Sequence, residues 1–165
     1  MLYIIGTPIG NLKDVTLRAQ EILASIPLVI VENWEDSIKF LHHYEIRPEK
    51  ILLYNDATRK RIPEIVDLLK KTNGAYITSA GMPGVSDPGA ELVAACRAAE
   101  INVMPIPGVS ALTTAISMCG MRGPFLFVEF LPRKKGALIK LLEHAKAFEE
   151  KIVCFESPYR IQKTL

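Results

Sequence analysis

The chain has little cysteine, which limits the covalent and metal chemistry that it can carry. Three cysteines occur in 165 residues, Cys96, Cys119 and Cys154, and they are widely spaced among apolar neighbours. An odd, scattered set predicts reduced, buried thiols and excludes a disulfide framework or a structural zinc site. His42 and His43 have no third ligand at a suitable spacing, so we predict no metal site.

A long hydrophobic run and a strong net charge are also missing. The apolar segment after Met1, residues 2–5, is too short for a signal peptide or a membrane span, and no basic segment precedes it. We therefore expect a cytoplasmic protein without a membrane partner. A net charge of +2 does not by itself indicate a nucleic-acid binder. With 49% hydrophobic and 23% charged residues, the chain is expected to be globular with a substantial core.

Short apolar runs alternate with helical patterns over the first two thirds of the sequence. We expect strands at residues 2–5, 27–31, 50–54, 75–78 and 102–106. Continuous apolar strands separated by helices are typical of a parallel sheet covered on both faces, so the predicted fold class is α/β with a mainly parallel five-stranded sheet. Ser37 is expected to cap a helix over 37–44, and a helix of small residues over 111–118 is expected to pack closely on the sheet.

The character of the sequence changes at residues 119–124, which hold two glycines and a proline. A strand over 125–131, a helix over 137–148 and a strand over 151–155 are predicted to follow. We interpret 1–118 as one α/β domain, 119–124 as a linker and 125–165 as the beginning of a second α/β domain that is incomplete. Because two strands rarely stabilise a domain, this part needs cover from the first domain, from further residues or from a second copy of the chain. We expect a homodimer.

The segment from Ser79 to Gly89, with the sequence SAGMPGVSDPG, joins a predicted strand to a predicted helix. Its glycines let the backbone approach a ligand closely, and its two prolines fix the path and remove N–H donors. A phosphate cradle needs successive free N–H groups, so this loop favours a ligand recognised by shape and by carbonyl oxygens. An ordinary strand-to-helix turn is the alternative interpretation.

Two more loops, residues 7–11 and 107–111, also follow predicted strands. In a parallel sheet the carboxyl ends of the strands share one edge, so the three loops are expected to converge on one crevice. The polar side chains that such a pocket needs would come from Asn11, Ser79, Ser86, Asp87 and Ser110. Alternatively, Asp87 and Ser110 only cap the helices that follow them.

Five ordered segments carry a family resemblance: residues 2–12, 79–89, 105–112, 130–134 and 155–161, which read LYIIGTPIGNL, SAGMPGVSDPG, PIPGVSAL, FLPRK and FESPYRI. With these motifs the chain resembles the bacterial small-subunit ribosomal RNA cytidine 2′-O-methyltransferases, which have the tetrapyrrole methylase fold. The resemblance covers essentially the whole chain.

The resemblance implies S-adenosylmethionine as cofactor, bound in a cleft between two α/β domains. The residues it implies as cofactor contacts are Pro8, Ala80, Gly81, Met82, Val85, Ser110 and Ala111, with Phe155 and Glu156 from the second domain. Because the family's second domain continues beyond the equivalent of Leu165, we expect a self-associating or truncated form with weak or no transferase activity.

The implied acceptor is a cytidine ribose in ribosomal RNA, so the partner is ribosomal RNA or the small ribosomal subunit. Asn11, Arg133, Lys134, Lys135 and Arg160 are the candidate substrate-binding residues. Basic side chains favour a polyanionic substrate because phosphate contacts dominate nucleic-acid affinity. A solvated basic loop is the alternative.

Methyl transfer to a hydroxyl needs positioning and a base for the hydroxyl proton. The candidates for the base or its orienting group are Glu32, Asp87 and Glu156, of which Glu32 and Asp87 are the predicted catalytic residues. An isolated Glu near a strand end is otherwise a surface or capping residue. A non-catalytic module of the same fold and a methyltransferase for a tetrapyrrole stay open as alternatives.

The chain departs from the family pattern at several positions. Asn33, Trp34 and Glu35 stand where the family has Asp-Thr-Arg, Ser79 stands where it has Asp, and Glu129 stands where it has Gly. Changes of this kind alter charge and hydrogen bonding in a crevice outright.

Overall fold

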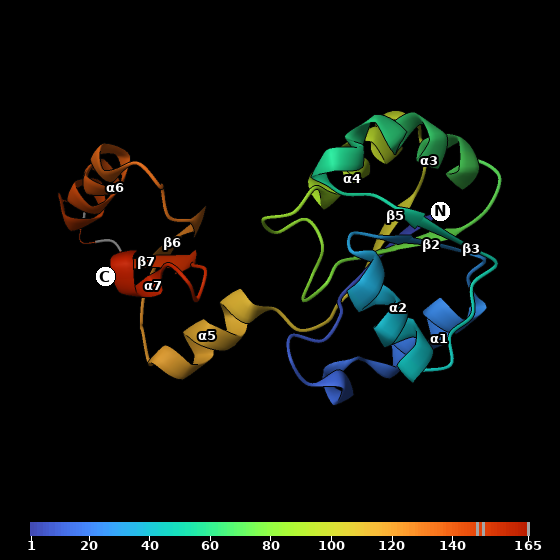
Figure 1. The fold of residues 1–165 in the computed structure, drawn as a ribbon, viewed down its shortest axis with the longest axis horizontal. Coiled ribbons are helices and arrows are strands. Elements are labelled where there is room, and N and C mark those ends of the chain that lie inside the picture. Colours follow the sequence, from blue (N-terminus) through green and yellow to red (C-terminus); the bar gives the residue numbers. More distant parts are fainter. Residues whose placement is uncertain (148, 150, 165) are drawn as a thin grey trace. The chain divides into compact units, whose positions relative to one another are not determined.

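A computed structural model describes residues 1–147, 149 and 151–164. The chain forms two compact units, Met1–Ala111 and Leu112–Leu165 (Figure 1). This division falls at the start of a helix, whereas the boundary predicted from the sequence is the linker 119–124. The domain limits 1–118 and 125–165 stay a prediction.

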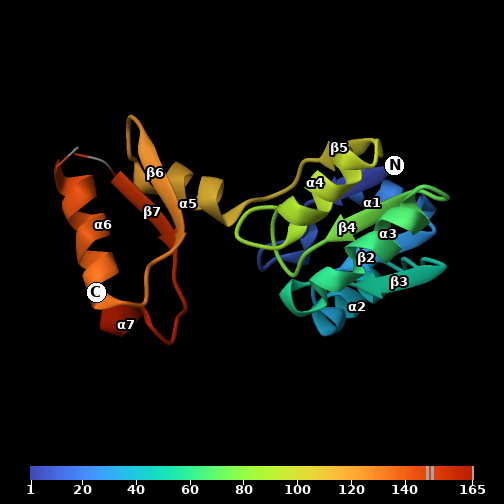
Figure 2. The ribbon, with the colours of Figure 1, turned by 90° about the horizontal axis from the view of Figure 1, so that it is seen from above.

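The first unit contains a five-stranded parallel sheet, as predicted. Its strands are β1 (Leu2–Ile5), β2 (Leu28–Val31), β3 (Lys50–Leu53), β4 (Gly74–Ile77) and β5 (Val103–Ile106). Their order across the sheet is β3-β2-β4-β1-β5, and every neighbouring pair is parallel (Figure 2). Because β1 lies between β4 and β5, the loops that follow these three strands leave the same edge side by side.

Helices cover both faces of this sheet (Figure 1). They are α1 (Leu17–Ser25), α2 (Trp34–His43), α3 (Ile62–Leu69) and α4 (Gly89–Ala98), with short 3-10 helices η1 (Leu12–Asp14) and η2 (Asp56–Arg61). One core contains Ile65 of α3 and Leu92 of α4. A second core contains Leu23 of α1 and Phe40 of α2. Burial of a large apolar side chain contributes about 1.5–3 kcal/mol, so these two cores fix the helices on the sheet.

Two local predictions are wrong, one for the cap of α2 and one for the burial of all three thiols. Ser37 does not cap α2, because Asn33 does so by accepting a hydrogen bond from Asp36 N at 3.2 Å. Ser37 lies inside the helix and is only 2% exposed. Asn is as good a cap as Ser, and carboxylates in the first turn favour the earlier start. Of the thiols, Cys96 is buried but Cys119 is exposed, because its helix buries no residue.

The second unit contains α5 (Ala111–Cys119, whose first residue closes the first unit), β6 (Phe125–Phe130), α6 (Lys135–Ala147), β7 (Lys151–Phe155) and α7 (Ile161–Thr164). No residue of α5 is buried, and α5 belongs to the second unit, so the close packing on the sheet that the sequence predicts for 111–118 stays a prediction. The predicted end of the next helix, Phe148, lies outside the described residues.

β6 and β7 form a parallel two-stranded sheet whose register shifts between Phe127 and Phe130. Glu129 lies within this irregularity with a φ of 53°. A positive φ favours glycine, which is the residue that the resembled family has there. In the described part of the chain, no helix combines the length and the hydrophobicity that crossing a bilayer requires.

Candidate functional site

The loops after β1, β4 and β5 meet at the carboxyl edge of the sheet. Thr7 and Gly81 exchange two backbone hydrogen bonds, from Thr7 N to Gly81 O at 3.0 Å and from Gly81 N to Thr7 O at 2.9 Å. The third loop joins them at Gly108, since a Cβ built on Gly6 would lie 2.8 Å from Gly108 Cα. Such an approach is possible only without side chains on both residues.

The loop over 79–89 uses many of its own N–H donors. Asp87 accepts hydrogen bonds from the backbone of Gly84, Val85 and Gly89 at 2.7–3.2 Å. These bonds hold the loop against the start of α4, where the N-cap residue is Pro88 and Asp87 accepts from the N–H of Gly89, the first residue of the helix. Since Gly81 N is held by Thr7, the loop offers a ligand few backbone donors, as expected for a site that does not bind phosphate.

Glu32 is the predicted catalytic carboxylate that lies beside this loop. It follows β2 and is partly buried, and its Oε2 accepts a hydrogen bond from Ser79 N at 3.2 Å. Burial raises the pKa of the Glu32 carboxyl, and the bond from Ser79 opposes part of that increase. The nearby carboxylates of Asp87, Asp56 and Asp36 raise the pKa further. A carboxylate with a raised pKa is better matched to proton transfer near neutral pH.

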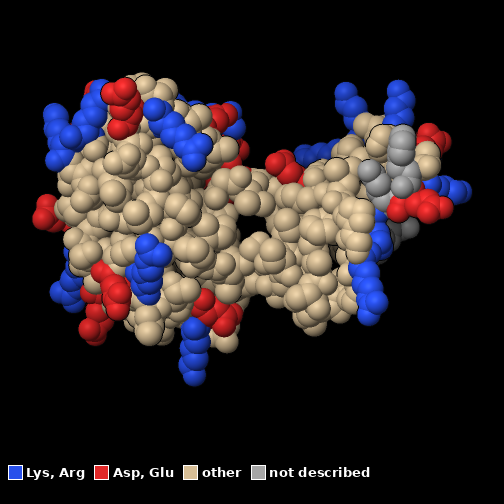
Figure 3. All heavy atoms as spheres, turned by 180° about the vertical axis from the view of Figure 1, so that it is seen from behind, with Lys and Arg blue, Asp and Glu red and all other residues tan. Residues whose placement is uncertain are grey.

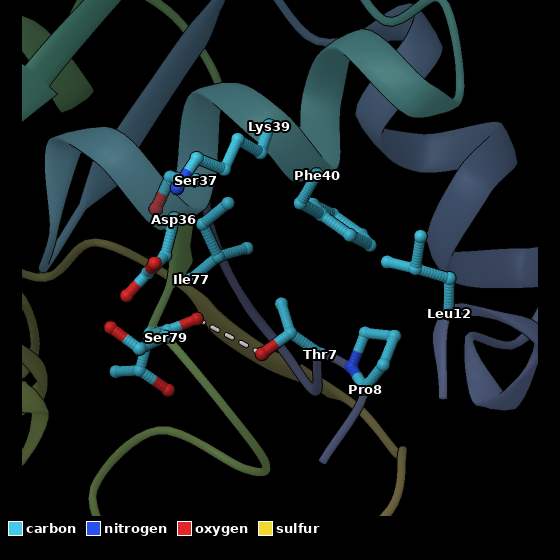
Figure 4. A pocket seen from close by; sticks show the side chains of 10 residues that line it. Thr7, Pro8, Leu12, Asp36, Ser37, Lys39, Phe40, Ile77 and Ser79 are labelled. Atoms are coloured by element: carbon cyan, nitrogen blue, oxygen red, sulfur yellow. Dashed lines mark hydrogen bonds between the residues drawn. The ribbon is translucent and has the colours of Figure 1, made fainter. Parts of the chain in front are cut away.

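A cavity of about 210 Å³ lies between α2 and the ends of β1 and β4 (Figure 4). Phe40 and Pro8 line one side of it, and Asp36 and Ser79 line the other. The Thr7 hydroxyl donates to the backbone carbonyl of the residue after β4 at 2.9 Å, which ties the two loops together below the cavity. Ser79 thus lies between this cavity and Glu32.

The structure brings together several residues implied as cofactor contacts in the first unit. Pro8 lines the cavity, Gly81 is bridged to the loop of Pro8, and the Met82 sulfur lies 2.7 Å from the position of a Cβ on Gly6. Ala80 and Val85 are exposed on the same loop, and Ser110 and Ala111 lie at the start of α5.

Asn11, a candidate substrate contact, uses its side chain to accept a hydrogen bond from Lys13 N at 3.1 Å. This bond caps η1, so the local structure already accounts for the residue. Ser86, proposed as a polar group of the pocket, has its hydroxyl buried without a hydrogen-bond partner among the described residues.

In the second unit, three of the predicted RNA contacts line one hollow of about 510 Å³. Lys135 is the first residue of α6, Arg133 lies just before that helix, and Arg160 precedes α7. Lys163 lines the same hollow, whereas Lys134 does not. Lys163 is not among the residues predicted from the sequence, although its spacing of three from Arg160 places both on one helical face.

The two second-unit residues implied as cofactor contacts are both engaged inside that unit. The Glu156 side chain is 4% exposed and forms an ion pair with Arg160 at 3.2 Å. Its oxygens also accept hydrogen bonds from Ser157 N at 2.8 Å and Thr164 Oγ1 at 3.1 Å. Phe155 packs edge-on against the aromatic rings of β6 at 5.1 and 5.8 Å.

Charges of both signs are spread over the face drawn in Figure 3. On the face drawn in Figure 3, Lys and Arg side chains project from both units, and acidic side chains lie among them. Among the described residues, no three His, Cys, Asp or Glu side chains are grouped in a way that could hold a metal ion.

Comparison with known proteins gives a consistent set of relatives. The family model described as Tetrapyrrole (Corrin/Porphyrin) Methylases matches residues 1–165. A relative from Coprothermobacter proteolyticus, named ribosomal RNA small subunit methyltransferase I, is 38% identical over 100% of this chain and 76% of its own length. A relative of the same name from Thermotoga maritima is 42% identical over 99% of this chain and 74% of its own length.

Solved structures with a similar fold are more distant in sequence. Diphthine synthase superposes with a TM-score of 0.76 at 12% identity, over 95% of this chain and 64% of that one. Uroporphyrin-III C-methyl transferase from Thermus thermophilus, complexed with S-adenyl homocysteine, gives a TM-score of 0.61 at 18% identity, over 79% of this chain and 59% of that one. At these identities the likeness shows the fold alone, and it confirms the predicted fold class.

Proposed function

We propose, because the chain belongs to the Tetrapyrrole (Corrin/Porphyrin) Methylases family, that it is an S-adenosylmethionine-dependent methyltransferase acting on a cytidine 2′-hydroxyl of small-subunit ribosomal RNA. The relatives' shared name supports ribosomal RNA as the substrate class. The observation that carries a catalytic function is the position of Glu32, partly buried and hydrogen-bonded to the loop over 79–89. The proposed substrate implies a cytoplasmic location.

The residues at the sheet edge fit a cationic cofactor without phosphate. The loop keeps its backbone donors for Asp87 and Thr7, and the Val109 carbonyl oxygen lies 3.7 Å from the position of a Cβ on Gly81. When bound, S-adenosylmethionine supplies a methyl group on a positively charged sulfur. Carbonyl oxygens and the carboxylate of Glu32 suit that charge.

Glu32 is proposed as the base that takes the ribose 2′-hydroxyl proton while the hydroxyl oxygen gains the methyl group. Ser79 N holds Oε2 in place, so the carboxylate enters the reaction already oriented. Asp87 is the weaker candidate because both of its oxygens accept hydrogen bonds from the loop backbone. We propose that Asp87 positions the loop.

The hollow in the second unit is proposed to hold phosphates of the RNA. Arg133, Lys135 and Lys163 present cations on its lining, and each cation that neutralises a phosphate releases a counterion. Arg160 has a second role, because removing it would leave the buried Glu156 carboxylate without its ion pair.

We also propose that the chain associates as a homodimer. The second unit exposes large apolar side chains, among them Phe125 at 41%, Phe130 at 53% and Leu142 at 50%. Covering such side chains is favourable by about 25 cal/mol per Å² of apolar surface. Light scattering would measure the mass, and a monomer over the working concentration range would contradict this part of the proposal.

Transfer of labelled methyl groups to small ribosomal subunits that lack the modification tests the function. We expect label in a 2′-O-methylated cytidine, and a rate about 10² to 10⁴ lower for Glu32→Gln. The matched control is Glu21→Gln, an exposed residue of α1. Label in a tetrapyrrole, or cofactor binding without transfer to any RNA, would instead support the two alternative functions.

A further inference from the structure

Two residues that line the cavity beside α2, Ser37 and Thr78, carry buried hydroxyl groups without a hydrogen-bond partner in the described part of the chain. Ser37 is 2% exposed and Thr78 is 4% exposed. A buried hydroxyl without a partner costs about 1–3 kcal/mol, so two of them around one cavity point to a ligand that uses them.

We propose that this cavity binds one nucleobase of the RNA acceptor, recognised by its exocyclic amino group. The proposal rests on the proposed function and names the part of the substrate that the cavity takes. The polar lining of the cavity includes four residues that offer oxygen acceptors, Asp36, Ser37, Thr78 and Ser79. Thr7, whose hydroxyl donates to the Thr78 carbonyl, and Lys39 also line it. An amino group on a heterocycle supplies the donors that such a wall needs.

The size and the opposite wall also suit a single flat ring. At about 210 Å³ the cavity is smaller than the roughly 300–1,000 Å³ typical of pockets for drug-sized ligands. Phe40, Pro8 and Leu12 form its apolar side (Figure 4). Proteins that read single-stranded RNA combine an aromatic or apolar surface for the base with hydrogen bonds to its edge.

The location of the cavity links a bound base to the methyl acceptor. Ser79 lines the cavity and donates its backbone N–H to Glu32 Oε2 at 3.2 Å. Pro8 lines the cavity and is also an implied cofactor contact. A base bound here would therefore hold its own ribose close to Glu32. Rotation about χ1 of Ser37 and Thr78 would turn their hydroxyls toward the base.

Titration with cytidine, followed by NMR shifts of the whole chain, tests the proposal. Uridine is the matched ligand, because it carries a carbonyl in place of the amino group. We expect saturable shifts at the cavity, with cytidine bound at least fivefold more tightly than uridine. The double variant Ser37→Ala/Thr78→Val should bind cytidine about tenfold more weakly, since two hydrogen bonds are lost. Asp36→Asn should reduce the preference for cytidine to less than twofold.

Tyr76→Phe is the control variant, because it removes another unpartnered buried hydroxyl that does not line the cavity. It should leave cytidine binding unchanged. An absence of saturable shifts, equal binding of the two nucleosides, or unchanged binding in the double variant would each overturn the proposal. Cytidine binding without methylation of RNA would instead contradict the proposed function and leave the base site standing.

Discussion

Replacing Gly6 by alanine tests the contact that joins the three loops of the candidate site. The new Cβ would lie 2.7 Å from Met82 Sδ, 2.8 Å from Gly108 Cα and 3.0 Å from Gly108 N. Ordinary contacts begin at 3.4 Å, so the backbone at Gly108 must move by about 0.6 Å. Unlike the end of a flexible side chain, that backbone belongs to a loop anchored by β5 and α5.

The expected loss of stability follows from two opposing effects. Overpacking of this kind costs about 1–3 kcal/mol, and we expect the upper part of that range because backbone atoms clash. Replacing glycine by alanine restricts the unfolded chain and returns about 0.4–1 kcal/mol. The net loss is about 2 kcal/mol, which corresponds to a melting temperature lower by roughly 4–8 °C for a chain of this size.

Thermal unfolding followed by tryptophan fluorescence measures this effect in the first unit, because the single tryptophan, Trp34, lies in α2. Gly136→Ala is the control for an added methyl group, since a Cβ there meets nothing within 4 Å and its φ is not in the positive region. Because Gly136 lies in the second unit, which Trp34 does not report, the unfolding of this control is followed by circular dichroism. We expect that control to melt no earlier than the parent chain. Gly6→Ala with a melting temperature within 1 °C of the parent chain would refute the reasoning.

Further predictions concern charges at the two candidate sites. Glu32→Gln should increase stability at pH 7, because the pKa of Glu32 is raised in the folded state. The stabilisation by the protonated carboxyl is therefore present below about pH 4.5 and is lost as pH rises through the folded pKa. Denaturant unfolding at several pH values measures this, and an unchanged pH dependence in the variant would refute it. Asp87→Asn should lower stability by about 1–3 kcal/mol and weaken cofactor binding, because Asp87 accepts hydrogen bonds from the loop backbone. Calorimetry measures both effects. A large loss of methyl-transfer rate with neither change would make Asp87 the base. The double variant Lys135→Ala/Lys163→Ala should reduce RNA affinity and lower the slope of log K, the RNA binding constant, against log salt concentration by about 1.4. Lys70→Ala in the first unit should change neither. Equal slopes for the double variant and the parent chain would remove the second-unit hollow from the RNA site.

The sequence by itself determined the strands, the fold class and the meeting of the three loops. Each buried strand is a short local run of apolar residues, as at Val29 and Ile77, and such runs are readable without knowing their neighbours. Parallel pairing then requires the loops after β1, β4 and β5 to share an edge, whatever their side chains do. The segments that carry the family resemblance lie in these same loops and in the second unit.

Only the tertiary structure decided which side chains act on one another across the sheet edge. Glu32 and Ser79 are 47 positions apart, yet they share a hydrogen bond because β2 and β4 are neighbours. Ser37 and Thr78 come from different elements, and both line one cavity only because α2 packs where it does. Their hydroxyls have no partner among the residues that the structure describes. Local patterns fix periodicity and caps, whereas these contacts depend on strand order and on helix packing, which no short segment of sequence encodes.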